Sequence, residues 1–303
     1  MSQMTDSTSP TKDDQLQAIQ DRNDTLVEQV SEQISFGTFD EENHQTLKQL
    51  VEGLGDPRGL MRLRFAETLG DIGEAATPFL VEALQTHEDV VVRRAAAKTL
   101  TLIADPVAVP SLLEAFLNDE DTVVKGSSAG ALARTGEAAA PYLLDILASP
   151  DHAQDIKGHA AWALAFMGSE AEAYLYKALN SDSLDVRCAV IGALGHVAQE
   201  KNDDKSCGLL ISALTDPEPL IRTEAAAALG QINYPASVPN LILALKDAEL
   251  DVRKAAINSL GKIGDPQAME ALQAALNDEL TVIKTLAKLA IRQIERQAEE
   301  DAW

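Results

Sequence analysis

The chain has 303 residues, of which 25 are basic and 48 acidic, giving a formal net charge of −23. A surface this acidic repels phosphate, which argues against nucleic acid and anionic membranes as partners. Hydrophobic residues make up 46% of the chain but aromatic residues only 4%, so aliphatic side chains must fill the core. The sequence contains no run of 18 apolar residues, its first residues are polar and acidic, and its two cysteines form no paired motif. These features predict a cytoplasmic protein without membrane insertion.

Three regions are predicted along the chain. Residues 1–12, rich in Ser, Thr and Asp, are expected to form a disordered acidic leader. Residues 13–55 have apolar residues at helical spacing and are expected to form an N-terminal helical cap and the first helix of the repeats, with Gly37 ending the first segment. Residues 56–303 are predicted to form a repeat array. Residues 1–56 also carry twelve acidic and three basic residues, so the negative charge is concentrated at this end.

A basic residue returns about every 31 residues, always after an apolar residue. Leu or Ile follows each basic residue seven positions later. A period of this length indicates one supersecondary unit copied in tandem. The repeated basic residues are Arg62, Arg93, Lys125, Lys157, Arg187, Arg222, Arg253 and Lys284.

Each unit is predicted to contain two helices, here called helix A and helix B. In residues 236–264, Pro239 lies near the expected start of helix A, where a missing N–H costs little. Asp247 is expected to begin the turn, Asp251 to cap helix B, and Gly261 and Gly264 to end it.

Asp stands six residues before the repeated base in most units, and His87 and Ser181 replace it in two. One interpretation is a row of cations for an anionic ligand. The favoured interpretation is structural: each base has acids close by, which predicts a ladder of hydrogen bonds and ion pairs along the stack. The longest step between bases contains a polar insert, residues 199–205. We expect a loop there, either a hinge or contact loop or, more simply, a tolerated surface insertion.

The two-helix unit, with its Pro, turn Asp, helix-B base and Leu-Gly ending, resembles the HEAT repeat. It is most similar to the short HEAT-like repeats of the phycobilisome (E/F-type bilin) lyase and phycobilisome-turnover family. The signature covers about residues 45–295. The resemblance implies an all-α fold, a right-handed α-α superhelix (HEAT-repeat solenoid) of about eight helix pairs plus N-terminal helices.

Positions one, five and nine residues after the repeated base lie on one face of helix B. This face is expected to line the concave side of the solenoid. We predict that Trp162 and Phe166 stack there on a large flat group, and that Arg94 or Lys98 pairs with its carboxylates. The alternative is that the two aromatic rings fill a packing gap. The candidate binding residues are His159, Trp162 and Phe166 in repeat four, Cys188 and His196 in repeat five, and Arg94 and Lys98 in repeat two, with Gly126, Gly130, Gly158 and Gly192 flanking them.

Cys188 follows Arg187, which suggests a lowered thiol pKa and a transfer thiol. The alternative is a small core side chain. No metal site is predicted. HEAT-like hydroxylases hold two irons with four His-Glu dyads, whereas this chain has one such pair, His87-Glu88.

The resemblance implies a role with bilins, which are open-chain tetrapyrroles. Lyases of this type attach or remove a bilin at a phycobiliprotein cysteine, and their relatives bind pigment proteins. The predicted function is therefore binding of a phycobiliprotein or its bilin on the concave helix-B surface, in phycobilisome chromophore attachment, assembly or turnover. The implied partner is a protein, either a phycobiliprotein or a second lyase-type subunit. Bilin is a candidate ligand rather than a cofactor.

No catalytic residue is assigned, because the family offers no short motif to match. A binding protein is favoured over an enzyme, with lyase-like activity left open. The alternative function is a non-enzymatic scaffold for another cytosolic complex, with the acidic N-terminal helix as a contact arm.

Overall fold

The computed structural model describes residues 12–201 and 204–300, which form helices and turns without a strand. The expectation of a disordered leader falls outside these residues, apart from Lys12, where the first helix begins. The chain divides into two compact units, one ending at Ala138 and one starting at Ala139. The period of the basic residues continues across this point, so the sequence does not mark the division.

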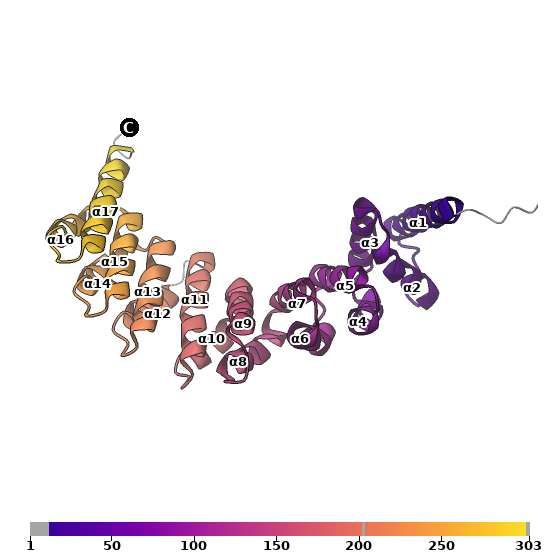
Figure 1. Cartoon of the computed structure of the whole chain (residues 1–303), viewed down its shortest axis with the longest axis horizontal. Helices are drawn as coiled ribbons and strands as arrows, with labels where there is room; N and C mark the ends of the chain where they lie inside the picture. Colours follow the sequence, from indigo (N-terminus) through magenta and orange to yellow (C-terminus); the bar gives the residue numbers. More distant parts are fainter. Residues whose placement is uncertain (1–11, 202–203, 301–303) are drawn as a thin grey trace, which may run out of the picture. The chain divides into compact units, whose positions relative to one another are not determined.

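The first unit contains an N-terminal helix followed by three helix pairs (Figure 1). Its helices are α1 (Lys12–Ser35), α2 (His44–Glu52), α3 (Gly59–Ile72), α4 (Thr77–Thr86), α5 (Val90–Ile103), α6 (Val109–Asn118) and α7 (Thr122–Arg134). Helix α3 packs against α5, and α5 packs against α7, so the helix-B members form one layer. The even-numbered members form the second layer, as predicted for helix A.

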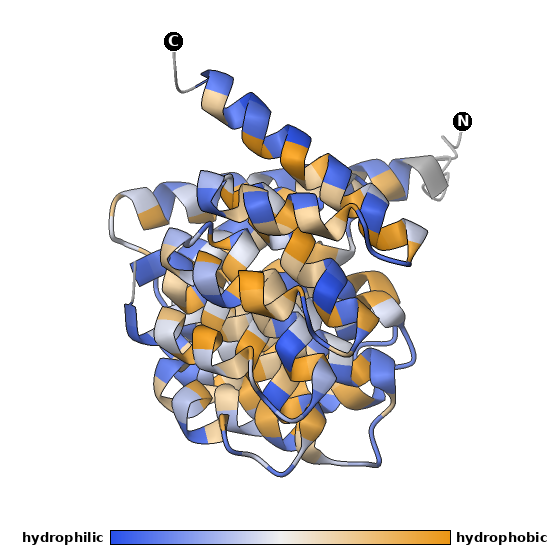
Figure 2. Cartoon of the chain, turned by 90° about the vertical axis from the view of Figure 1, so that its left-hand side faces the viewer, coloured by the Kyte–Doolittle hydropathy of each residue, from blue (hydrophilic) through white to orange (hydrophobic). Residues whose placement is uncertain are grey.

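The second unit continues the same alternation in five helix pairs. Its helices are α8 (Ala140–Ala148), α9 (Gln154–Met167), α10 (Glu172–Ala178), α11 (Leu184–Lys201), α12 (Asp204–Ala213), α13 (Pro219–Gln231), α14 (Val238–Ala244), α15 (Leu250–Ile263), α16 (Met269–Ala275) and α17 (Thr281–Glu300). The helix-B members α9, α11, α13, α15 and α17 pack in succession. The turns that join the helices are mostly hydrophilic (Figure 2). The predicted all-α repeat architecture is confirmed.

Single-turn 3₁₀ helices join many of the elements. They are η1 (Gly53–Gly55), η2 (Gly73–Ala76), η3 (Pro106–Ala108), η4 (Gly136–Ala138), η5 (Gly168–Ala171), η6 (Pro235–Ser237) and η7 (Pro266–Ala268). Most lie directly before a helix A. Gly264, which follows α15, has φ 75° and accepts the left-handed conformation that a helix end requires.

The leucine that follows each base by seven residues lies in the core. Leu69, Leu132 and Leu229, for example, are fully buried. The base and the leucine lie seven residues apart on the same helix. Burial of the leucine in the core therefore places the base near the start of that helix, beside the turn that precedes it.

Where the repeated base is an arginine, it closes the turn of its own repeat. Arg222 donates from Nη1 to the carbonyl oxygen of Asp216 at 2.8 Å, and Arg93 donates to the carbonyl oxygen of His87 at 3.1 Å. The acceptor is a backbone oxygen, so the bond survives where the Asp is replaced. The side chains that replace Asp also accept a backbone N–H within the turn. His87 Nδ1 accepts from the Asp89 N–H at 3.0 Å, and Ser181 Oγ accepts from the Ser183 N–H at 3.2 Å.

In three places the base also reaches the next repeat. Arg93 pairs with Asp119 at 2.9 Å, and Arg222 with Asp247 at 2.7 Å. Lys157 pairs with Asp185 at 2.5 Å. These bonds confirm the structural interpretation of the repeated bases as a ladder.

Three local expectations were wrong. Gly261 does not end helix B, because it lies inside α15, where an added Cβ would lie 2.9 Å from Ala290 of α17. Asp251 does not cap helix B: α15 begins at Leu250, and Asp251 lies inside the first turn, where it pairs with Lys254 at 2.8 Å. The acceptor for the backbone in this turn is Asp247, which accepts from the Glu249 N–H at 2.9 Å.

The expected loop at residues 199–205 is also absent from the residues described there. Glu200 and Lys201 extend α11, and Lys205 lies in α12 with its ammonium 3.5 Å from the centroid of the Tyr176 ring. Glu200 accepts from the Ser169 N–H at 2.9 Å, and Lys201 pairs with Glu172. The extra residues therefore lengthen helices that are held by contacts with η5 and α10. Residues 202–203 lie outside the described chain.

Candidate binding surface on helix B

The positions one, five and nine residues after each repeated base are here called the helix-B face. In repeat four this face carries an aromatic pair on α9. Trp162 and Phe166 are 50% and 53% exposed, and their ring centroids lie 5.5 Å apart with an angle of 32° between the planes. Rings this exposed do not fill an interior gap. His159, one turn before Trp162, is exposed, and its Nδ1 lies 2.8 Å from the Asp155 carbonyl oxygen.

The neighbouring helix α11 packs against α9 and carries the other two predicted residues of this unit. His196 is exposed and Cys188 is half-buried. The expectation of a lowered thiol pKa was wrong. Burial, followed by the nearby carboxylates of Glu224 and Asp185, raises the pKa of Cys188 to about 11, and these effects outweigh the opposing charge of Arg187. The thiol is therefore protonated at neutral pH.

Four glycines on the helix-B face have open space in front of them. A Cβ atom added at Gly158 or Gly192 would meet no heavy atom within 4 Å, and the same holds for Gly126 and Gly130 in the first unit. Glycine inside a helix costs about 1 kcal/mol relative to alanine. The packing around these four positions offers no reason for that cost. Without side chains at these positions, a ligand or partner can come close to the helix backbone.

Arg94 and Lys98 lie on α5 in the first unit, and the other five predicted residues lie in the second. Arg94 donates from Nε and Nη2 to the two carboxylate oxygens of Asp121, at 2.9 and 2.5 Å. This ion pair holds the pKa of Asp121 well below its usual range. Lys98 is exposed. A single groove that joins both sets of residues stays a prediction, and any ligand carboxylate at Arg94 must compete with Asp121.

Exposed apolar side chains also lie on the helix-B face outside repeat four. Leu63 and Leu102 in the first unit and Leu289 in the second are each at least half exposed. A face that combines exposed apolar side chains with open backbone is typical of a binding surface.

A hollow of about 500 Å³ lies between α13 and α15 on this face, and sequence analysis did not single it out. Its cations are Lys254 and Lys262, with Asn258 between them on α15. These residues occupy the three helix-B-face positions of repeat seven. Their placement on one face therefore follows from the period of the repeated base.

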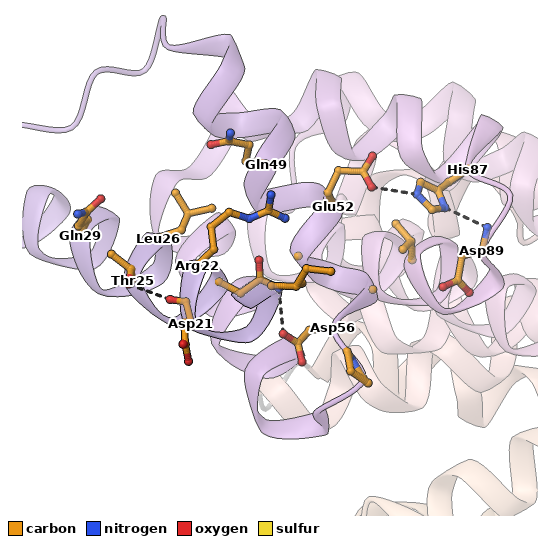
Figure 3. A pocket seen from close by; sticks show the side chains of 16 residues that line it. Asp21, Arg22, Thr25, Leu26, Gln29, Gln49, Glu52, Asp56, His87 and Asp89 are labelled. Carbon is orange, nitrogen blue, oxygen red and sulfur yellow. Dashed lines mark hydrogen bonds and ion pairs between the residues drawn. The ribbon is translucent and has the colours of Figure 1, made fainter. Parts of the chain in front are cut away.

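A second cavity, of about 880 Å³, lies in the first unit between α1, the end of α2 and the turn before α5 (Figure 3). Arg22 extends from α1 toward the side formed by Gln49 and Glu52 (Figure 3). His87 Nε2 lies 3.6 Å from Glu52 Oε2. Since His87 Nδ1 accepts a backbone N–H, its Nε2 carries the proton that faces Glu52.

Asp56 forms the buried edge of this cavity. It accepts from the Arg58 Nε at 3.0 Å and from the Asn23 amide at 3.0 Å. These bonds, led by the one from Arg58, lower the pKa of Asp56 to about 2. The pair fixes α1 to the start of the repeats, since Arg58 also pairs with Asp24 of α1 at 2.8 Å.

Within residues 12–201 and 204–300, no group of three or more His, Cys, Asp or Glu side chains is arranged to hold a metal ion. Across the same residues, no helix is both long enough and apolar enough to span a membrane.

The fold defines an α-helical repeat protein, and comparisons with known proteins agree with that class. The family model described as HEAT repeats matches residues 47–133, 78–165 and 208–292. The chain is 39% identical over 206 residues to the bilin biosynthesis protein MpeU of Synechococcus sp. (strain WH8020), covering 68% of this chain and 69% of that protein. The chain therefore belongs to the HEAT-repeat family and to the family that includes MpeU.

Solved structures with a similar fold include a karyopherin and importin beta. The karyopherin Kap121p, bound to the extreme C-terminus of the protein phosphatase Cdc14p, matches with a TM-score of 0.58 and 14% identity over 96% of this chain and 38% of that chain. Importin beta matches with a TM-score of 0.50 and 16% identity over 82% of this chain and 41% of that chain. At this level of identity the likeness establishes the fold alone.

Proposed function

We propose that this protein binds a bilin or a bilin-carrying phycobiliprotein on the helix-B face, in the attachment, assembly or turnover of phycobilisome chromophores. The observation that carries the proposal is the exposed Trp162–Phe166 pair, together with 39% identity to a bilin biosynthesis protein. The rings present flat apolar surface to solvent, and a conjugated tetrapyrrole offers the matching flat surface.

The surroundings of the aromatic pair support this role. Gly158 precedes Trp162 by one turn on α9, and Gly192 lies on the adjacent α11, so a broad ligand reaches the backbone beside the rings without meeting side chains. A raised thiol pKa at Cys188 disfavours a covalent relay through that sulfur at neutral pH. A carrier or chaperone of the pigment therefore fits these residues better than a covalent intermediate on Cys188.

The test mixes the purified protein with free bilin and with apo-phycobiliprotein and follows the visible absorbance. The variant Trp162→Ala/Phe166→Ala should lose the spectral change while keeping its melting temperature. A matched control is Tyr142→Ala/Leu243→Ala, which removes two exposed apolar side chains from helix-A members of the same unit. Reversible colour supports a carrier, and covalent colour on the target supports a lyase. Full colour with the aromatic variant would refute the proposed surface.

A second candidate function is a scaffold that holds another protein through the N-terminal helix. The cavity between α1, α2 and the turn before α5 favours it, because Glu52 and Arg22 present charged side chains there from two elements. The discriminating variant is Arg22→Ala/Glu52→Ala, with Arg296→Ala/Glu300→Ala on α17 as its control. If the protein changes neither the bilin nor the apo-phycobiliprotein absorbance, and a partner captured from native lysate is lost with Arg22→Ala/Glu52→Ala but retained with the aromatic variant, the scaffold function is the correct one.

A further inference from the structure

In repeats two to eight the helix-B face differs in charge from the rest of the molecule, whereas in repeat one it carries Glu67 and Asp71. From repeat two to repeat eight, its positions include five basic residues and no acidic residue, whereas acidic residues outnumber basic ones almost two to one in the whole chain. The basic residues are Arg94, Lys98, Arg134, Lys254 and Lys262. A helix face from which acids are excluded in so acidic a chain is suited to anionic groups.

Two of these cations line one hollow. Lys254 and Lys262 both border the hollow of about 500 Å³ between α13 and α15. They are eight residues apart on one helix, which corresponds to about 12 Å along its axis. Asn258 lies between them with an exposed amide that can donate to a carboxylate.

The floor and one end of the hollow also suit a polypeptide. Small side chains, Ala227, Ala255 and Ser259, line it beneath the cations, and Leu220 at its edge is 47% exposed. Ser259 is itself held by a 2.7 Å bond to the Ala226 carbonyl oxygen, so this part of the floor is fixed between the two helices.

The pairing of Lys254 is weak enough to be exchanged. Its partner Asp251 lies three residues earlier on the same helix, and the carboxylate is 75% exposed. Pairs of this kind contribute roughly 0.2–1 kcal/mol, so an incoming carboxylate can take the place of Asp251. Glu249 lies at the same end, which leaves Lys262 at the less acidic end of the hollow.

We propose that this hollow docks an acidic segment of a partner protein, with carboxylates on Lys254 and Lys262 and a hydrogen bond from Asn258. In an extended segment, side chains four residues apart are separated by about 13 Å, which is close to the rise of about 12 Å along α15 between the two lysine positions. The inference rests on the helix-B face being the binding face, as proposed above, and adds the chemistry of the protein that meets it.

The probe is a fluorescein-labelled hexaglutamate peptide, titrated with the full chain at low ionic strength and followed by fluorescence anisotropy. Lys254→Gln/Lys262→Gln should weaken binding about fivefold or more, the loss expected for two exposed charge pairs. Lys246→Gln/Lys284→Gln is the matched control, because both lysines are exposed, lie in the same unit and do not border the hollow. Asp251→Asn should tighten binding, because it releases Lys254.

Equal weakening by both double variants would mean that the peptide senses net charge alone, and would overturn the proposal. Absence of hexaglutamate binding by the unmodified protein would overturn it as well, as would equal binding of a hexaglutamine peptide. The experiment contains no pigment, so it can fail while the aromatic pair still binds bilin, and it can succeed if that pair does not.

Discussion

Arg222 joins two consecutive repeats through a single guanidinium group. Its Nε and Nη2 donate to the two carboxylate oxygens of Asp247 in the next turn, at 2.7 and 2.8 Å, while its Nη1 donates to the carbonyl oxygen of Asp216 in its own turn. Both charged side chains are less than 15% exposed. The base thus fixes the end of one helix A and the spacing to the following repeat at once.

Replacing Arg222 by Ala should therefore cost about 3 kcal/mol of unfolding free energy, because Asp247 is left with a buried, unpaired charge. Arg62→Ala is the comparison, since the corresponding residue in the next turn is His87 and the bond of Arg62 is to the Asp56 carbonyl oxygen. That variant should lose about 1 kcal/mol. Urea unfolding followed by circular dichroism measures both. Equal losses would show that the bond to the next repeat adds nothing.

The bidentate pair at Asp56 makes the first unit sensitive to acid. Its pKa of about 2 lies below its ordinary value of 3.8, so folding favours the ionised form. The stabilisation is fully present above the ordinary value and is lost as the pH falls from about 4 to about 2. Asp56→Asn should remove this part of the acid dependence. Melting temperatures of the two proteins, measured from pH 6 down to pH 2, should converge at the acid end; curves that stay parallel would contradict the assignment.

The sequence predicts the environment of a residue where contacts within its own repeat determine that environment. The buried leucine at Leu229 and the bonded base at Arg222 follow from a period that the core imposes on every copy. The exposure of Trp162 follows from its register on helix B. The ion pair between Arg94 and Asp121 could not be predicted in this way. It depends on how the turn of the next repeat approaches Arg94, and the sequence period does not determine that approach. The cap at α15 was misassigned because the helix starts one residue before Asp251, with Glu249 at the N-cap position, and Asp247 accepts the Glu249 N–H in the preceding turn.

The buried environment of Cys188 predicts a slowly reacting thiol. With a pKa of about 11, the thiolate that attacks an alkylating reagent is scarce at pH 8, and the rate should rise steadily toward pH 11. The experiment follows iodoacetamide alkylation by mass spectrometry in a Cys207→Ser background, with glutathione as the reference thiol. A rate plateau near pH 8 would indicate an ordinary or lowered pKa and would reopen the transfer-thiol hypothesis.

The open glycines of α9 and α11 predict opposite effects on stability and on binding. Gly158→Ala and Gly192→Ala meet no atom within 4 Å, so each should stabilise its helix by about 0.5–1 kcal/mol. If the backbone beside Trp162 lies against the pigment, the added methyl groups should at the same time weaken pigment binding. Gly208→Ala, on α12, has equally open surroundings and should stabilise without affecting binding, because it belongs to a helix A. Gly230→Ala should instead destabilise, since its Cβ would lie 2.3 Å from Ser259 Oγ. Thermal melts and bilin absorbance titrations on the four variants separate these outcomes: if Gly158→Ala and Gly192→Ala raise the melting temperature and leave the titration unchanged, the ligand does not approach this part of the helix-B face.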